Sequence, residues 1–171
     1  MKPNLPNVLC TRCGLCCDGS LFADVELAAR ETSPLEVLGL EIEDADQGEP
    51  ALLLQPCAAL KRKRCSIYPH RPNCCRTFEC RVLKQVESAA ISVDRAKQTI
   101  ASALKEVRRV KVLMAELGED NQLLPLQERF SEALTLSSNI TDDPQMNRKR
   151  ADAKIAITRL QNLLQQTFLD A

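Results

Sequence analysis

The sequence predicts a mainly α fold, in which an irregular cysteine-rich N-terminal module precedes a C-terminal three-helix bundle. The chain of 171 residues is 44% apolar but only 3% aromatic, so its core must use Leu, Val, Ile and Ala, a composition that favours helices over sheets. All nine cysteines precede Arg81, and helical spacing of apolar residues follows it. We therefore expect a first module at residues 1–84 and a helical module at residues 85–171.

Proline and glycine interrupt the first part so often that only short helices and loops are expected there. One short helix is expected from Asp24 to about Arg30. Ser33 and Pro34 form an N-cap and N1 pair that should start the next helical turn.

The first long helix of the second part is indicated by apolar residues whose spacing alternates between three and four. Ser92 or Asp94 can serve near its N-cap, and Gly118 stands at the expected C′ position. The stripe consists of Val93, Ala96, Ile100, Ala103, Val107, Val110, Met114 and Leu117. It is expected to be an internal face of the bundle, although dimerisation through it stays open.

Two further helices complete the predicted bundle. A shorter one follows Pro125, with Leu126, Phe130 and Ala133 or Leu134 on its apolar face, and fades at residues 137–139. The last one starts at Thr141-Asp142-Asp143-Pro144, which places carboxylates at a helix N-terminus and proline at N1. Its expected buried stripe is Ala153, Ile157, Leu160, Leu164 and Phe168.

Charge is segregated along the chain although the net charge is zero. The segment from Asp18 to Glu49 is acidic, and the segment from Cys57 to Lys84 is basic. The residues before Cys10 lack the apolar core of a secretion signal, and no stretch approaches the roughly 18 apolar residues of a membrane span. A cytoplasmic location is therefore expected, where cysteines stay reduced and serve as ligands or reactive groups.

The clearest motif is Cys-Thr-Arg-Cys-Gly-Leu-Cys-Cys, which contains Cys10, Cys13, Cys16 and Cys17. A Cys-x-x-Cys turn brings two sulfurs to the separation that tetrahedral metal coordination needs, and Gly14 relaxes the backbone between them. Adjacent cysteines usually project in different directions. This pattern predicts two metal ions, or one cluster and a spare thiol.

Further donors come from Cys57, Cys65, Cys75 and Cys80, so that eight sulfurs could serve two four-coordinate sites. Zinc and iron both suit such donors. Cys17 follows Cys16 too soon for the ferredoxin pattern, but an iron–sulfur cluster completed by a remote cysteine stays an alternative. The surrounding bases can offset the negative charge of metal thiolates; they are Arg12, Arg71, Arg76 and the run Lys61 to Arg64.

The spaced motifs resemble the YkgJ-type CxxCxxCC cysteine-cluster family, which is described as zinc- or iron-chelating. The resemblance covers roughly the first 85 residues and rests on residues 10–17, Pro56-Cys57, Cys65 to Tyr68, and Arg71-Pro72 through Cys80. It implies the ligand set Cys10, Cys13, Cys16, Cys17, Cys57, Cys65, Cys75 and Cys80, with Cys74 left as a free thiol. Flagellin lysine N-methylases look like longer relatives, but no methyl-donor glycine motif is present, so methyl transfer is not carried over.

Three functions follow from these features. The first is a metal-binding protein that chelates zinc or iron. The second is an iron–sulfur redox or accessory enzyme in which Cys74 or Cys17 reacts. The third is a zinc-stabilised interaction module for a protein or nucleic-acid partner.

Several residues outside the cysteine motifs are expected to have structural roles. With a single histidine, His70, no catalytic triad can be assembled, and a turn position explains this residue. The basic run Lys61 to Arg64 lacks interleaved aromatic residues, so nucleic-acid binding is not expected, whereas a protein partner could use the helices. Tyr68 and Phe78 are expected to form a small core under the metal loops.

Overall fold

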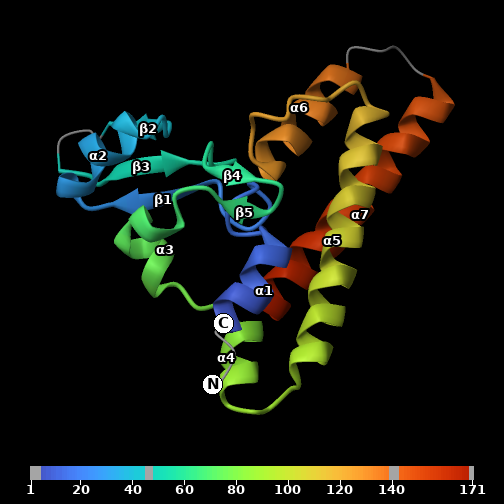
Figure 1. The fold of residues 1–171 in the computed structure, drawn as a ribbon. Helices are drawn as coiled ribbons and strands as arrows, with labels where there is room; N and C mark the ends of the chain where they lie inside the picture. The colour runs from blue at the N-terminus through green and yellow to red at the C-terminus, as the bar shows by residue number, and fades with distance from the viewer. Residues whose placement is uncertain (1–4, 45–47, 139–142, 170–171) are drawn as a thin grey trace. The chain divides into compact units, whose positions relative to one another are not determined.

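The computed structural model describes residues 5–44, 48–138 and 143–169. The fold is mainly helical, with 59% helix and 9% strand, which confirms the predicted class (Figure 1). The chain divides into two compact units, Met1–Glu79 and Cys80–Ala171.

A small antiparallel sheet is the centre of the first unit, although the sequence predicted only helices and loops there. Its strands are β1 (Asp24–Leu27), β2 (Ile42–Glu43) and β3 (Ala51–Leu54), in the order β1-β3-β2. Asp24 pairs with Leu54 in the antiparallel β1–β3 register. The helix expected at 24–30 is therefore wrong, because Asp-Val-Glu-Leu alternates polar and apolar residues with the period of a strand.

Two short helical turns follow β1. The 3₁₀ helix η1 (Ala29–Glu31) runs directly into α2 (Thr32–Val37), whose N-cap is Glu31. The predicted cap at Ser33 is wrong, because the hydroxyl of Thr32 donates to the Ala29 carbonyl and the turn has already begun. Ser33 and Pro34 consequently lie inside the first turn of α2.

The rest of the first unit is built from short elements around this sheet. They are α1 (Leu5–Cys13), the hairpin of β4 (Leu60–Lys61) and β5 (Arg64–Cys65), the 3₁₀ helix η2 (Tyr68–His70), and α3 (Asn73–Thr77). The core is aliphatic and consists of Leu27, Leu35, Leu40, Leu53 and Ala59. Phe78 is 38% exposed and packs edge-on against Phe22, so the expected core of Tyr68 and Phe78 is wrong.

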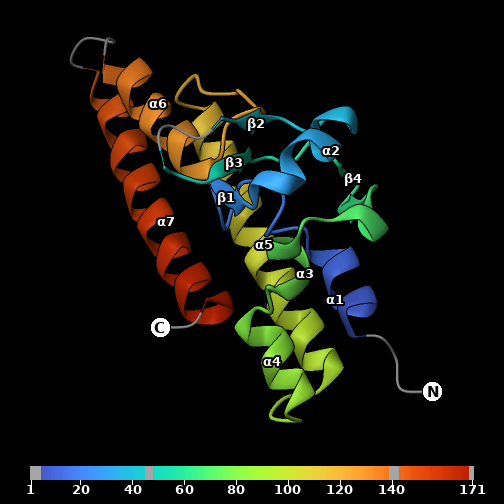
Figure 2. The same ribbon diagram turned by 90° about the vertical axis from the view of Figure 1, so that its left-hand side faces the viewer.

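The second unit contains the three predicted long helices, which are α5 (Val93–Ala115), α6 (Leu126–Ser138) and α7 (Pro144–Phe168). Each of these helices packs against the other two, and Figure 2 shows α5 beside the short helix α4 (Arg81–Glu87). The sequence did not predict α4, which has only seven residues and directly follows Cys80. It buries Val82 and Leu83, and Arg81 donates to the Gln166 carbonyl at 2.9 Å.

The ends of α5 are formed as the sequence predicted. The hydroxyl of Ser92 accepts a hydrogen bond from the Arg95 amide at the N-terminus. At the other end, the amides of Gly118 and Glu119 donate to the carbonyls of Ala115 and Met114, with Gly118 at φ 91°. The predicted stripe is buried from Ala96 to Leu117, and its first residue, Val93, is half-buried.

The apolar faces of the other two helices are also confirmed. Leu126 and Ala133 are buried on α6, and the whole predicted stripe of α7 is buried. Asp143 caps α7 by accepting from the Gln145 amide at 2.9 Å, and Pro144 is the first helical residue. Thr141 and Asp142 lie outside the described residues.

A buried ion pair orders the loop between α5 and α6. Glu119 and Arg129 are 1% and 2% exposed, and Oε2 of Glu119 lies 2.9 Å from Nε of Arg129. The other oxygen of Glu119 accepts from the Asn121 amide at 2.6 Å. These charges have left water, so each depends on the other for compensation.

We predict that Glu119→Gln lowers the free energy of unfolding by about 3 kcal/mol, because it leaves the buried guanidinium of Arg129 without a charge partner. Urea unfolding followed by helical circular dichroism measures the change. Glu116→Gln is the matched control, because Glu116 is in an exposed pair with Lys149 at 3.7 Å and should cost less than about 1 kcal/mol. Equal effects of the two substitutions would contradict the prediction.

Among the described residues, no helix combines the length and the apolar character that crossing a membrane requires.

Candidate metal centre

The CxxCxxCC motif forms the end of α1 and the tight turn that follows it. Cys10 and Cys13 lie one turn apart on α1, with Cys10 exposed. Gly14 ends the helix at φ 78°, and the Cys17 amide donates to its carbonyl at 2.9 Å. Leu15 is fully buried and anchors the turn, while Cys16 and Cys17 are half-buried.

Cys57 is tied directly to this turn by backbone hydrogen bonding. Its amide donates to the Cys17 carbonyl at 2.9 Å and to the Gln55 side-chain oxygen at 3.0 Å. Gln55 is 4% exposed, and its backbone amide donates to the Ala23 carbonyl. Backbone hydrogen bonds therefore hold the second cysteine segment against the first, and the buried Gln55 side chain fixes the local turn at Cys57.

The β4–β5 hairpin brings Cys65 to the same region. Cys65 pairs with Leu60, and both the amide and the hydroxyl of Ser66 donate to the Ala59 carbonyl, at 2.8 and 3.0 Å. The hairpin lies against α1, and a Cβ added to Gly14 would be 3.5 Å from Cα of Lys63. The loop between Cys57 and Cys65 is thus closed onto the turn that carries Cys17.

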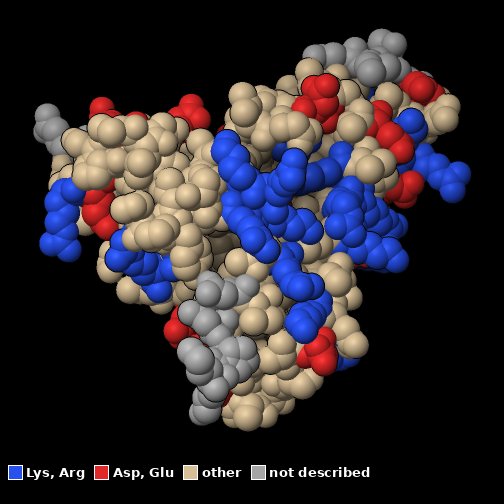
Figure 3. Space-filling model, in the orientation of Figure 1, with Lys and Arg blue, Asp and Glu red and all other residues tan. Residues whose placement is uncertain are grey.

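Basic side chains cover this hairpin. Figure 3 shows Lys and Arg side chains over β4 and β5, and Lys61, Arg62, Lys63 and Arg64 are all exposed. Burial raises the pKa of Cys57, and the positive charge of Lys61 opposes that rise. The run therefore stands where it can offset negative charge on the thiols.

The adjacent cysteines of α3 have different surroundings. Their Sγ atoms are 4.0 Å apart. Cys74 packs against the aliphatic core, whereas Cys75 is close enough to Cys17 and Cys57 for their charges to raise its pKa, after the larger effects of its hydrogen bond with Cys74 and of burial. Cys75 is therefore the member of the pair that is electrostatically linked to the other cysteine segments.

Burial and neighbouring thiols shift the pKa of several cysteines in this unit. Burial, followed by the charges of Cys57 and Cys65, raises the pKa of Cys17 to about 12. The hydrogen bond between the α3 thiols lowers the pKa of Cys74 and raises that of Cys75. Several thiolates can coexist here only if a cation compensates them, and metal binding would release their protons.

Cys80 is placed by different elements. It precedes α4 as its N-cap residue and accepts from the Lys84 amide at 3.1 Å through its carbonyl. Burial raises the pKa of its thiol. It belongs to the second unit, Cys80–Ala171.

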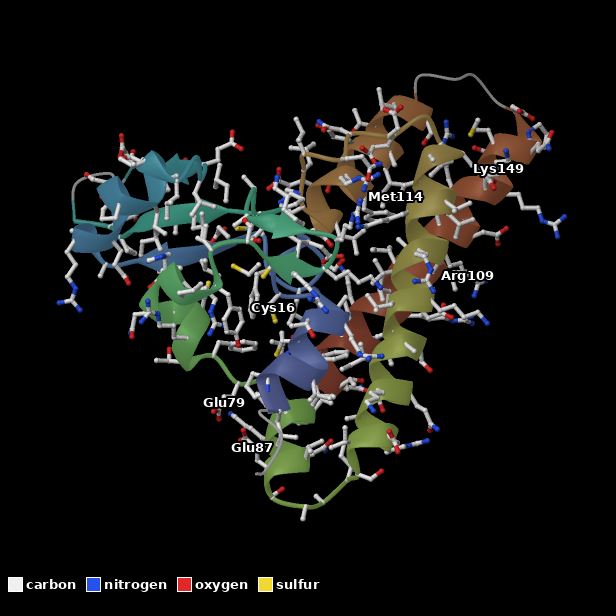
Figure 4. The ribbon with its side chains drawn as sticks, in the orientation of Figure 1. Cys16, Glu79, Glu87, Arg109, Met114 and Lys149 are labelled. Atoms are coloured by element: carbon white, nitrogen blue, oxygen red, sulfur yellow. The ribbon has the colours of Figure 1, made fainter. Side chains whose placement is uncertain are left out.

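The cysteine side chains are suitable donors for a thiophilic metal, but the described thiols are not arranged in a coordination geometry. Figure 4 shows sulfur atoms gathered near Cys16, between α1, α3 and the β4–β5 hairpin, and no cysteine among the described residues is in a disulfide. Within residues 5–44, 48–138 and 143–169, no three His, Cys, Asp or Glu side chains stand close enough to hold a metal ion. Coordination would require the thiols to rotate and their loops to adjust. His70 is exposed at the end of η2.

Residues 9–104, more than half of the chain, match the model of the CxxCxxCC family, whose description reads "Putative zinc- or iron-chelating domain". The chain belongs to this family. The resemblance found from the sequence is thereby confirmed, and the family description supports metal binding. Searches of curated proteins and of solved structures returned no match.

Sequence reasoning missed the polar side chains that hold the cysteine segments together. Gln55 supports Cys57, Ser66 closes the hairpin beside Cys65, and Glu31 accepts from the Asn73 amide at 2.7 Å at the start of α3. The sequence offers one signal for each of the first two: Gln55 lies two residues before Cys57, and Ser66 directly follows Cys65. Glu31 is 42 residues from its partner, and nothing in the sequence indicates that contact.

We predict that Gly14→Ala destabilises the first unit by about 1 kcal/mol, because an L side chain at φ 78° is strained. Tyr68 is the only tyrosine and there is no tryptophan, so intrinsic fluorescence during urea unfolding reports this unit. Gly39→Ala is the matched control, with φ 76° and no atom within 4 Å of the added Cβ. Both substitutions should cost the same stability, but only Gly14→Ala should weaken metal binding. A Gly14→Ala protein of unchanged stability would disprove this account.

Proposed function

We propose that this chain chelates zinc or iron through cysteine thiolates, with Cys10, Cys13, Cys16, Cys17, Cys57, Cys65, Cys75 and Cys80 as the ligand set. One observation carries the proposal. The Cys57 amide donates to the Cys17 carbonyl at 2.9 Å, and strand β5, which carries Cys65, packs against α1, which carries Cys10 and Cys13, so cysteines from distant parts of the sequence lie in one region. Thiolate donors of this kind suit zinc and iron rather than magnesium or calcium.

The metal's main role in this proposal is to stabilise the first unit. The buried apolar residues described in that unit are Leu and Ala, with no fully buried aromatic side chain among them, which makes a small core for its length. Ligation of a structural zinc contributes on the order of 10 kcal/mol to folding. Metal bonds between α1, the hairpin and α3 would therefore replace packing that the sequence does not supply.

Eight donors correspond to two four-coordinate ions or to one cluster with additional thiols. Cys80 would join the others as a donor from the second unit, on the strength of the family motif alone. The alternative for the same cysteines is an iron–sulfur cluster. The ratio of metal to acid-labile sulfide distinguishes a cluster from separately bound metal ions.

We predict that protein purified without oxygen retains zinc or iron, up to two ions per chain in the absence of sulfide. Elemental analysis, a sulfide assay and an absorption spectrum provide the counts. Equal amounts of iron and acid-labile sulfide would instead establish a cluster and favour the redox alternative. Protein that neither retains nor takes up zinc or iron would overturn the proposal.

We predict that Cys75→Ser and Cys74→Ser differ in metal binding although the residues are adjacent. Cys75→Ser removes a proposed ligand, so its affinity should fall by more than the roughly 10- to 100-fold typical of losing a group that only supports a ligand. Cys74→Ser should leave the affinity close to that of the natural chain. Competition with a chromophoric chelator measures both, and the reverse order would assign the ligand to Cys74.

A further inference from the structure

We propose that Arg71 is a positioning residue that selects Cys75, rather than Cys74, as the thiol that α3 presents to metal. This inference rests on the proposed metal-binding function. It is carried by contacts of α3 with the loop Tyr68 to Arg71 and with Glu31, none of which involves a thiol directly.

The first contact supplies a hydrogen-bond donor that α3 lacks. A helix of five residues leaves most of its carbonyls without a helical partner. Nη1 of Arg71 donates to the Cys75 carbonyl at 3.2 Å, and Nε of the same side chain donates to the Tyr68 carbonyl at 3.1 Å. One guanidinium therefore joins the loop before α3 to the backbone of Cys75.

Two further groups restrict the position of this guanidinium. Its central carbon lies 3.7 Å from the centre of the Tyr68 ring, a cation–π arrangement that suits the planar guanidinium better than an ammonium. Arg76 donates to the carbonyls of Arg71 and Pro69, at 2.6 and 2.9 Å. Arg71 is thus held through both its side chain and its main chain.

The opposite end of α3 is held as well. One carboxylate oxygen of Glu31 accepts from the Asn73 amide at 2.7 Å, and the other accepts from the Ala28 amide at 3.3 Å. With Glu31 at its start and Arg71 near its end, α3 is prevented from turning about its own axis.

Rotation matters here because adjacent helical residues differ by about 100° in direction. A shift of one residue would exchange the position of Cys74, which packs on the aliphatic core beside Cys57 and Cys65, with that of Cys75, the member of the proposed ligand set whose carbonyl Arg71 holds. The Arg71 contacts fix one of these two arrangements before metal binds. Metal binding then does not have to order α3, which raises the affinity.

The test is zinc protection of the individual cysteines in the full-length chain. Reduced protein with and without Zn²⁺ is alkylated, and tandem mass spectrometry resolves Cys74 from Cys75. Arg71→Lys keeps the positive charge but loses the planar fork. Arg30→Lys is the control, because Arg30 is an exposed residue of η1 in the same unit. The midpoint of cooperative urea unfolding verifies that each variant is folded, because the intensity of Tyr68 itself changes when the neighbouring Arg71 is replaced.

In the natural chain and in Arg30→Lys, zinc should protect Cys75 and leave Cys74 reactive. In Arg71→Lys, protection of Cys75 should fall or shift to Cys74, and zinc affinity should fall roughly tenfold, while Cys17 and Cys57 stay protected. Unchanged protection and affinity in Arg71→Lys would overturn the inference, and so would an equal loss of protection at every cysteine, which indicates general destabilisation. A natural chain that zinc does not protect at all would reject the proposed function itself.

Discussion

The burial of several thiols in one small region is the constraint on which the first unit depends. Burial raises the pKa of Cys17 and of Cys57, and the charge of Cys65 adds to both rises. A fold that gathers such groups without a disulfide is less stable when they ionise than when a cation compensates them. Metal binding is therefore a response to the electrostatics of the fold as well as a consequence of the cysteine motif.

Polar side chains, more than apolar packing, bring these thiols together. Gln55 accepts from the Cys57 amide that also reaches the Cys17 carbonyl, and Glu31 and Arg71 hold the two ends of α3. Each contact satisfies a backbone group that a short element leaves without a partner. This arrangement suits a unit with a small aliphatic core, because hydrogen bonds to irregular backbone take over the placement of its loops.

The sequence predicted the helical unit better than the cysteine unit, for a physical reason. In α5 and α7 the burial pattern repeats along a long segment, so Ile100 or Leu160 can be assigned to the core from spacing alone. Strand β1 has only four residues, too few for its alternation to outweigh a composition that favours helices. The candidate ligands were predicted from the spacing of cysteines, but the polar side chains that support them were not. The contact of Glu31 with Asn73 arises because α3 packs against β1, the strand that leads into η1.

The two units therefore rely on different sources of stability. The second is held by an apolar seam on α5 and by the buried pair of Glu119 and Arg129, neither of which depends on redox state or metal. The first has a small core and many thiols, so oxidation or metal loss acts on it directly. Because Tyr68 belongs to the first unit and most of the helix to the second, fluorescence and circular dichroism separate the two responses within one chain. Metal removal that lowered the stability of both units equally would show that the cysteine cluster also supports the helices.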